Sequence, residues 1–297
     1  MDLALAVVLP AANWNLSIIP VDPSTFLRRR YLHPQSGSRA TVPPPLRTAK
    51  ATGKFGVLKC RDVRLSLQVN SAMKNLNARA WLALVVLAIA MGFLLFVSSG
   101  TFHYWQAWVY LSIFMGASAL TTVYLMRRDP ALLERRMSGG PMAEKERTQK
   151  FIMLCTSIGF IALLVVPAFD RRFGWSTIPF GGAVSGDVLV AIGFYFIFLV
   201  YRENTFTSAT IEVAENQKVI SSGPYAIVRH PMYASASLYL LGTPFALGSY
   251  WAFVVVAAMI PFLIWRLLDE ERFLAKNLSG YIEYQQRVRH RLVPFVW

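Results

Sequence analysis

Charged residues are scarce in this sequence. Asp, Glu, Lys and Arg make up 15% of the 297 residues, whereas hydrophobic residues make up 55%. A typical soluble domain is about 25% charged, so this composition argues against a soluble enzyme. It also excludes a chain that is disordered throughout. The hydrophobic residues come in long blocks, which predicts an all-α fold, a multi-pass membrane helical bundle.

Cysteine and histidine are also rare. The two cysteines, Cys60 and Cys155, are far apart and neither belongs to a CxxC pair, and there are only four histidines. Structural and catalytic metal sites need clusters of such ligands at short spacings. We therefore expect neither a disulfide framework nor a metal cofactor.

The common signatures of soluble catalytic domains are missing. No GxGxxG turn is present, so we expect no Rossmann domain, and GxxxxGK[ST], GxSxG and HExxH do not occur either. We expect the chemistry to reside at the cytoplasmic ends of the last membrane helices.

The positive charge is concentrated near the N-terminus. Residues 1–79 hold 12 Lys and Arg against 3 Asp and Glu, a net charge of +9, whereas residues 80–297 hold 18 against 13, a net charge of +5. Nucleic-acid binding needs a folded basic surface, and we expect no nucleic-acid partner. A basic leader before a membrane domain is more typical of contact with anionic lipid or of topology control.

Residues 1–72 carry 7 of the 16 prolines and no sustained apolar period. We interpret them as a disordered basic leader or as residues that precede the true start at Met73, and we favour both over a targeting peptide. Residues 73–297 are expected to form the membrane domain, with the catalytic part at about 202–294.

Six apolar blocks follow the leader, each long enough or nearly long enough to cross hydrocarbon as a helix. They cover residues 80–98, 104–126, 151–169, 188–201, 232–247 and 250–265. The fifth is short, and the brief step before the sixth predicts a tight helical hairpin. No charged residue lies within these blocks, which argues against a transporter or scaffold with ionisable side chains inside its bundle.

The loops between the blocks differ in charge. Residues 127–150, 202–231 and 266–297 hold seven, three and six Lys and Arg, whereas residues 99–103 hold none and residues 170–187 hold two. The positive-inside rule then places both termini and the catalytic loops on the cytoplasmic side.

The segment Gly223–Tyr233 is the densest in candidate functional residues. Pro231 suits the first position of a helix, which places Arg229 and His230 at a helix N-terminus. The free N–H groups and the dipole there favour an anion such as a carboxylate. The alternative is that the pair only anchors the helix at lipid headgroups.

A second cluster follows the last apolar block. Arg266 and Glu270 are four residues apart and share one helical face. They could form an ordinary surface ion pair with a snorkelling arginine. However, a guanidinium at this depth is also suited to bidentate recognition of a carboxylate.

The pattern of residues 281–294 predicts a short amphipathic helix at the membrane surface.

Together these motifs resemble the isoprenylcysteine carboxyl methyltransferase family, and the related phospholipid methyltransferases share much of the pattern. The pattern is Gly-Pro-Tyr-x3-Arg-His-Pro-x-Tyr, an apolar hairpin, Arg-x3-Glu-Glu-x2-Leu, and then Tyr-x2-Tyr. The resemblance covers about residues 202–294, and the leader matches nothing. Two details depart from it. Ser235 stands where members often have Gly, and the spacing from Glu271 to Tyr281 is one residue short.

The resemblance implies an integral membrane enzyme that uses S-adenosylmethionine without a Rossmann domain. It implies that Arg266 faces the substrate, and we add Arg229 as a second catalytic candidate. The residues that it implies line the cofactor are Gln217, Lys218, Val219, Ile220, Tyr225, His230, Pro231, Met232, Tyr233 and Glu270.

The acceptor is less well specified by sequence. A carboxylate nucleophile needs no general base, whereas an amine must first lose a proton. This favours carboxyl O-methylation of a lipophilic acceptor that enters from the lipid bilayer. A phospholipid N-methyltransferase is the closest alternative. An NADPH-dependent sterol-type reductase is a further one, although Met232 stands where such enzymes have Asn before the Tyr. The last alternative is a membrane protein without enzymatic activity.

Overall fold

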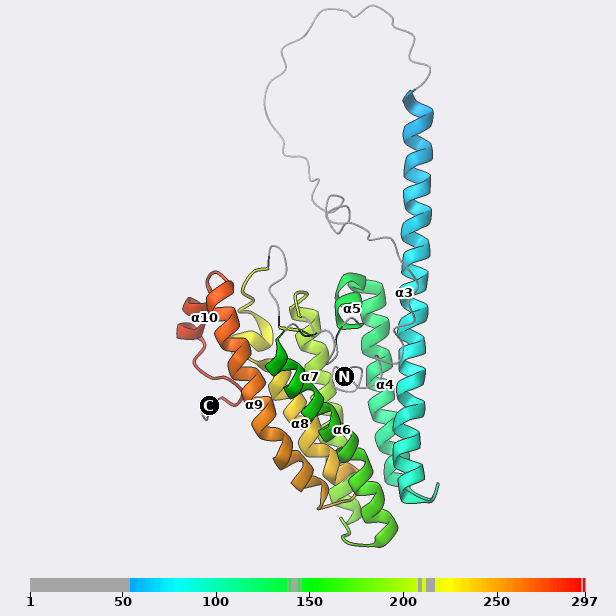
Figure 1. The fold of residues 1–297 in the computed structure, drawn as a ribbon, viewed down its shortest axis with the longest axis vertical. Helices are drawn as coiled ribbons and strands as arrows, with labels where there is room; N and C mark the ends of the chain where they lie inside the picture. The colour runs from blue at the N-terminus through cyan, green and yellow to red at the C-terminus, as the bar shows by residue number, and fades with distance from the viewer. Residues whose placement is uncertain are drawn as a thin grey trace, which may run out of the picture. The chain divides into compact units, whose positions relative to one another are not determined.

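A computed structural model describes residues 54–137, 139, 144, 146–207, 210–211, 217–294 and 296, with side chains from residue 73 onward. All regular structure in these ranges is helical, which confirms the predicted all-α bundle. The helices, shown in Figure 1, are α3 (Lys54–Ser99), α4 (Trp105–Arg128), α5 (Pro130–Met137), α6 (Arg147–Phe173), α7 (Phe180–Glu203), the 3₁₀ turn η2 (Gly223–Ala226), α8 (Pro231–Ala246), α9 (Ala252–Asn277) and α10 (Tyr281–Arg287).

The start of α3 lies within the segment predicted to be a leader. The helix begins at Lys54, and residues 73–297 form one compact unit. Residues 1–53, which make up most of the predicted leader, lie outside the described residues. The domain boundary at residues 72 and 73 therefore stays a prediction.

All six predicted apolar blocks coincide with helices. Five of the described helices are long and apolar enough to cross a membrane, namely residues 73–99 of α3 together with α4, α6, α7 and α9. The remaining block, the fifth in the chain, forms α8, which has 16 residues. It spans about 24 Å, less than the roughly 30 Å of hydrocarbon. The expectation of a short fifth block is confirmed, and among the described residues five helices are long enough to span and α8 is shorter.

Helices α7 and α8 approach each other closely at glycines. A Cβ atom on Gly193 of α7 would lie 2.8 Å from the backbone nitrogen of Tyr239, and one on Gly242 of α8 would lie 2.8 Å from the carbonyl oxygen of Gly186. Small residues allow two membrane helices to pack backbone against backbone. This contact fixes the position of α8, whose first residues form part of the site described below.

The turn between α8 and α9 is held by polar side chains. Tyr104 donates a hydrogen bond of 2.6 Å to the carbonyl oxygen of Leu247, and Ser249 donates one to the buried carboxylate of Asp170. Asp170 also accepts from the backbone and side chain of Ser176. These contacts join the loops at the end of the bundle opposite the site, and they stabilise the predicted hairpin.

The predicted apolar blocks contain no charged residue, but the helix that carries the fourth block contains Asp187, just before the block. The fourth block was expected to begin at Val188, but α7 begins at Phe180, so Asp187 lies two turns inside the helix and is 6% exposed. The apolar run alone missed the first turns of α7 because they consist of small residues, which are compatible with a helix packed tightly against a neighbour.

Candidate active site

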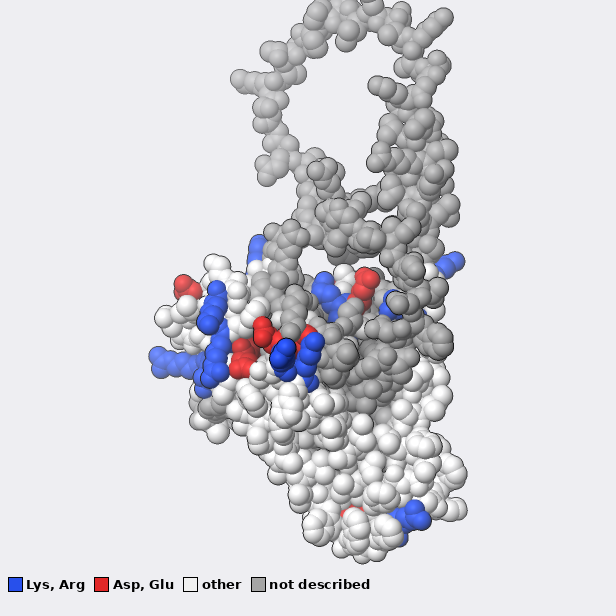
Figure 2. Space-filling view, viewed as in Figure 1, with Lys and Arg blue, Asp and Glu red and all other residues white. Residues whose placement is uncertain are grey.

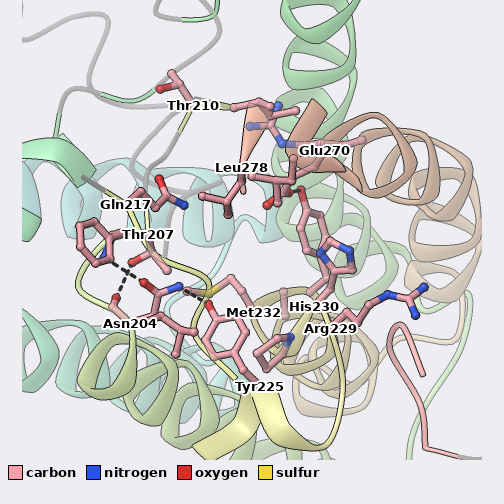
Figure 3. A pocket seen from close by; sticks show the side chains of 18 of the residues that line it. Asn204, Thr207, Thr210, Gln217, Tyr225, Arg229, His230, Met232, Glu270 and Leu278 are labelled. Carbon is pink, nitrogen blue, oxygen red and sulfur yellow. Dashed lines mark hydrogen bonds between the residues drawn. The ribbon is translucent and has the colours of Figure 1, made fainter. Parts of the chain in front are cut away.

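All twelve predicted site residues line one cavity at the end of the bundle where η2, the end of α9 and α10 meet. Figure 3 shows Gln217, Tyr225 and Glu270 arranged around it. The cavity thus brings together three segments that are separated in the sequence. These are residues 217–220 before the turn, residues 225–233 at the start of α8, and Arg266 and Glu270 on α9.

The start of α8 forms as the sequence predicts. Pro231 occupies the first helical position and His230 is the N-cap residue. The backbone N–H groups of Arg229 and His230 donate hydrogen bonds of 2.9 and 3.0 Å to the carbonyl oxygens of His290 and Arg291. The predicted C-terminal amphipathic helix therefore ends early, at Arg287, and the chain then lies against the start of α8.

Arg229 is held by protein groups on several sides. Its Nε atom lies 2.7 Å from the Glu271 carboxylate, and its Nη1 atom donates to the carbonyl oxygens of Val288 and Arg289, each at 2.9 Å. Figure 3 shows its side chain extending away from the centre of the cavity. These contacts suit a positioning residue better than a group that touches the reacting atoms.

Glu271 anchors the polar network behind the cavity. Besides Arg229, it pairs with Arg291 at 2.8 Å and lies 3.3 Å from Nε2 of His230. The carboxylate is almost completely buried. A buried carboxylate is tolerated only with such partners, so Glu271 stabilises the folded C-terminal region.

Glu270, the adjacent residue, lies on the cavity wall. Its Oε2 atom accepts a hydrogen bond of 2.8 Å from the Tyr233 hydroxyl. Both side chains line the cavity, so the carboxylate is available to a cationic ligand. The two glutamates of the motif therefore have different surroundings, which the sequence could not distinguish.

Arg266 is 9% exposed and lies one turn before Glu270 on α9. Its Nη2 atom pairs with Glu144 at 2.7 Å, and its Nη1 atom donates to Gln149 at 2.9 Å. Arg266 lines the cavity with the other predicted site residues, but nothing in the sequence indicated its acidic partner from the segment before α6.

Tyr225 is fixed from two directions. Asn204 donates a hydrogen bond of 2.9 Å to its hydroxyl, drawn dashed in Figure 3, and the Tyr284 hydroxyl donates one of 2.8 Å to its carbonyl oxygen. Burial raises the pKa of Tyr225 to about 12. Its hydroxyl is therefore neutral at physiological pH, and its ring lines the cavity.

Arg136 is a site residue that sequence reasoning missed. It comes from α5, far from the recognised motifs, and lines the same cavity while almost completely buried. Its Nη2 atom donates 2.7 Å to the Tyr201 hydroxyl, and its guanidinium carbon lies 4.9 Å from the centre of the Tyr201 ring. Burial lowers the pKa of Arg136, and the neighbouring Tyr201 offsets only part of this effect.

The cavity also has an apolar wall built from the membrane helices, which the sequence motifs did not indicate. This wall includes six side chains that lie deeper in α6 to α9 than Arg266 and Glu270: Met153, Thr156, Ile197, Ala236, Tyr239 and Leu263. None carries a charge. The cavity thus joins a polar surface made by the loop segments to an apolar surface within the bundle.

The sequence comparisons agree with this site. The phospholipid methyltransferase family model matches residues 182–280. The chain is 30% identical over 153 residues to protein-S-isoprenylcysteine O-methyltransferase B of Arabidopsis thaliana, covering 48% of this chain and 72% of that protein.

The chain belongs to the isoprenylcysteine carboxyl methyltransferase family. It is an integral membrane methyltransferase, as its apolar helices and its family both indicate. The family match extends from α7 into the turn before α10, so it contains the glycine contact, the start of α8 and the Arg266–Glu270 turn. Arg136 and Glu144 lie outside the matched residues of the family model.

The surface of this membrane methyltransferase is divided into a charged and an uncharged region, as the cavity wall is divided into a polar and an apolar part. Figure 2 shows charged side chains gathered around the end of the helices that carries α10, while the surface along the helices is largely uncharged. The site therefore lies at the boundary between a polar and an apolar environment.

Proposed function

We propose that this enzyme transfers a methyl group from S-adenosylmethionine to the carboxylate of a lipophilic, isoprenylcysteine-like acceptor. The observation that carries the proposal is the placement of Arg266. Its buried guanidinium lies in a cavity that has polar loops on one side and uncharged side chains from four membrane helices on the other. A lipid-borne carboxylate requires both surfaces.

The polar part of the cavity fits the methyl donor. S-adenosylmethionine supplies an electrophilic methyl group on a sulfonium, together with an ammonium, a carboxylate and an adenosine. The Glu270 carboxylate and the faces of Tyr225 and Tyr233 suit its cationic end. Residues Gln217–Ile220 and His230–Met232 would form the remaining wall.

Arg266 would bind the acceptor. A guanidinium recognises a carboxylate through two parallel hydrogen bonds, and one helical turn of about 5.4 Å separates Arg266 from Glu270. Donor and acceptor can therefore be brought together by one face of α9. Positioning and exclusion of water are the main tasks in an in-line methyl transfer.

No general base is required for an ionised carboxylate. His230 is the one histidine among the residues that line the cavity, and it lies against Glu271. This arrangement favours an acceptor that needs no deprotonation over the amine of an aminophospholipid. Arg229 would act as a positioning residue through Glu271 and the C-terminal carbonyl groups.

We further propose that both termini and the site face the cytoplasm. The two basic loops and the basic tail contain α5, η2 and α10, which lie at the same end of the bundle (Figure 1). Lys and Arg are enriched in cytoplasmic loops. Helix α8 runs into the bundle and α9 returns, so this sidedness does not depend on whether α8 crosses completely.

The proposal can be tested with purified full-length protein in lipid nanodiscs. Titration with S-adenosylmethionine should show saturable binding, whereas NADPH should not bind. With the donor present, a farnesylated cysteine with a free carboxylate should be methylated, and its carboxamide should not. Methylation of phosphatidylethanolamine alone would instead assign the chain to phospholipid N-methylation, and binding of NADPH alone would indicate a reductase.

A further inference from the structure

A buried hydroxyl on α10 has no explained role in the fold. The side chain of Tyr281 is 4% exposed and lines the cavity. Its hydroxyl oxygen is fully buried and has no hydrogen-bond partner among the described residues. Buried polar groups are rarely left unpaired, because each loses its hydrogen bonds to water without compensation. An unpaired donor on the wall of a binding cavity is best explained by a ligand.

The position of the Tyr281 ring is well determined by its neighbours. It packs with Leu278, Tyr284 and Val288 in a small apolar cluster, and Val219 of the expected donor-binding segment packs against this cluster. Gly280 adopts a φ of +82° immediately before α10, a conformation that glycine tolerates without strain. The turn and the cluster therefore hold the Tyr281 side chain in place on the cavity wall.

The electrostatic surroundings of the Tyr281 hydroxyl indicate that it is available as a hydrogen-bond donor. Burial raises the pKa of Tyr281, and the nearby carboxylates of Glu270 and Glu271 raise it further. The group is therefore a neutral O–H at physiological pH and offers a donor to an oxygen atom. Tyr284, one turn later, has already used its hydroxyl on the carbonyl oxygen of Tyr225 at 2.8 Å.

We propose that Tyr281 is a ligand-binding residue whose hydroxyl donates a hydrogen bond to an oxygen of the bound methyl donor, either a ribose hydroxyl or the carboxylate. The inference rests on the proposed use of S-adenosylmethionine. It assigns to α10 a direct part in donor binding, in addition to its packing against α9.

Tyr281→Phe and Tyr284→Phe form a matched pair of variants, because each removes one hydroxyl and keeps the aromatic ring. Removal of an unpaired hydroxyl should leave the Tm of the ligand-free protein unchanged or raise it, whereas Tyr284→Phe loses a hydrogen bond and should lower it. In binding titrations, Tyr281→Phe should raise the Kd for S-adenosylhomocysteine about tenfold, which corresponds to roughly 1.4 kcal/mol.

A titration with 5′-methylthioadenosine, which lacks the amino-acid portion, identifies the oxygen. Weaker binding of both ligands would indicate the ribose, and weaker binding of S-adenosylhomocysteine alone would indicate the carboxylate; either result supports the inference. Equal Kd values in wild type and folded Tyr281→Phe for both ligands would overturn it while leaving the proposed function intact. If the wild type binds neither ligand, the proposed function fails, and this inference fails with it.

Discussion

The carboxylate of Glu144 lies 2.7 Å from the guanidinium of Arg266, and both side chains are buried. Arg266 is the group proposed to bind the acceptor, so Glu144 already occupies one of its hydrogen-bonding positions. An incoming carboxylate must replace this partner or share the guanidinium with it. The pair therefore sets the strength with which the acceptor is held.

Glu144→Gln should lower the KM for a carboxylate acceptor by severalfold, because it removes a competing negative charge while preserving a hydrogen-bond acceptor. The same change should reduce the free energy of unfolding by about 1–3 kcal/mol, since a charged hydrogen bond is weakened. Steady-state kinetics and thermal unfolding would measure the two effects. A higher KM would show that Glu144 orients Arg266 rather than competing for it.

Arg266→Ala should raise the KM for the acceptor with little change in donor affinity, because the lost contact serves the acceptor. Arg266→Lys should recover only part of the loss, since an ammonium cannot form the bidentate contact. Arg272→Ala is a suitable control, because the Arg272 side chain is 72% exposed and pairs with Asp269 rather than with a group in the cavity. Loss of donor binding with normal acceptor affinity would reverse the assigned roles.

The two adjacent glutamates should respond differently to the same substitution. Glu270→Gln should weaken S-adenosylmethionine binding by about 1–3 kcal/mol if the contact is buried and charge-assisted. Glu271→Gln should chiefly lower stability, because it disturbs the pairs with Arg229 and Arg291. Isothermal titration and thermal unfolding of both variants would separate these effects. Equal losses of donor affinity at the two positions would show that Glu270 on the cavity wall and Glu271 in the network behind it do not have separate roles.

Arg136→Gln should raise the KM for a carboxylate acceptor, because it removes a buried cation from the cavity that holds Arg266. Arg135→Gln provides a control on the same helix, since Arg135 donates instead to the carbonyl oxygen of Thr205. Kinetics with the carboxylate acceptor would measure the difference. An unchanged KM in Arg136→Gln would limit Arg136 to anchoring α5 on Tyr201.

Single cysteines introduced at Thr101 and Glu134, with Cys60 and Cys155 replaced, should be labelled from opposite sides of the membrane. Thr101 lies in the short loop before α4 and Glu134 lies on α5, so one crossing separates them. An impermeant maleimide applied to sealed vesicles of known orientation would report each side. Labelling of both positions from one side would refute the topology.

Several features of this site could be predicted from the sequence because they depend on local chemistry. Pro231 after Arg229-His230 specifies a helix start, and the spacing of Arg266 and Glu270 places both on one helical face. The short α8 followed from the length of the apolar block and the brief step before α9.

Other features depend on tertiary contacts and could not be predicted in this way. Nothing near Glu144 or Arg136 marks them as neighbours of Arg266, because the chain brings them there through α5 and the start of α6. The different surroundings of Glu270 and Glu271 arise from the C-terminal segment, which returns to the start of α8. Asp187 was misplaced because small residues before it obscured the true beginning of α7.

The chemical stability of the transferred methyl group tests the central claim most directly. The protein in nanodiscs would be incubated with S-adenosylmethionine labelled in its methyl group and with a farnesylated cysteine acceptor. The lipid product would then be treated with alkali. A carboxyl methyl ester is hydrolysed, so the account predicts that the label is released as volatile methanol. Label that stays non-volatile after alkali would show methylation of nitrogen and would contradict the account.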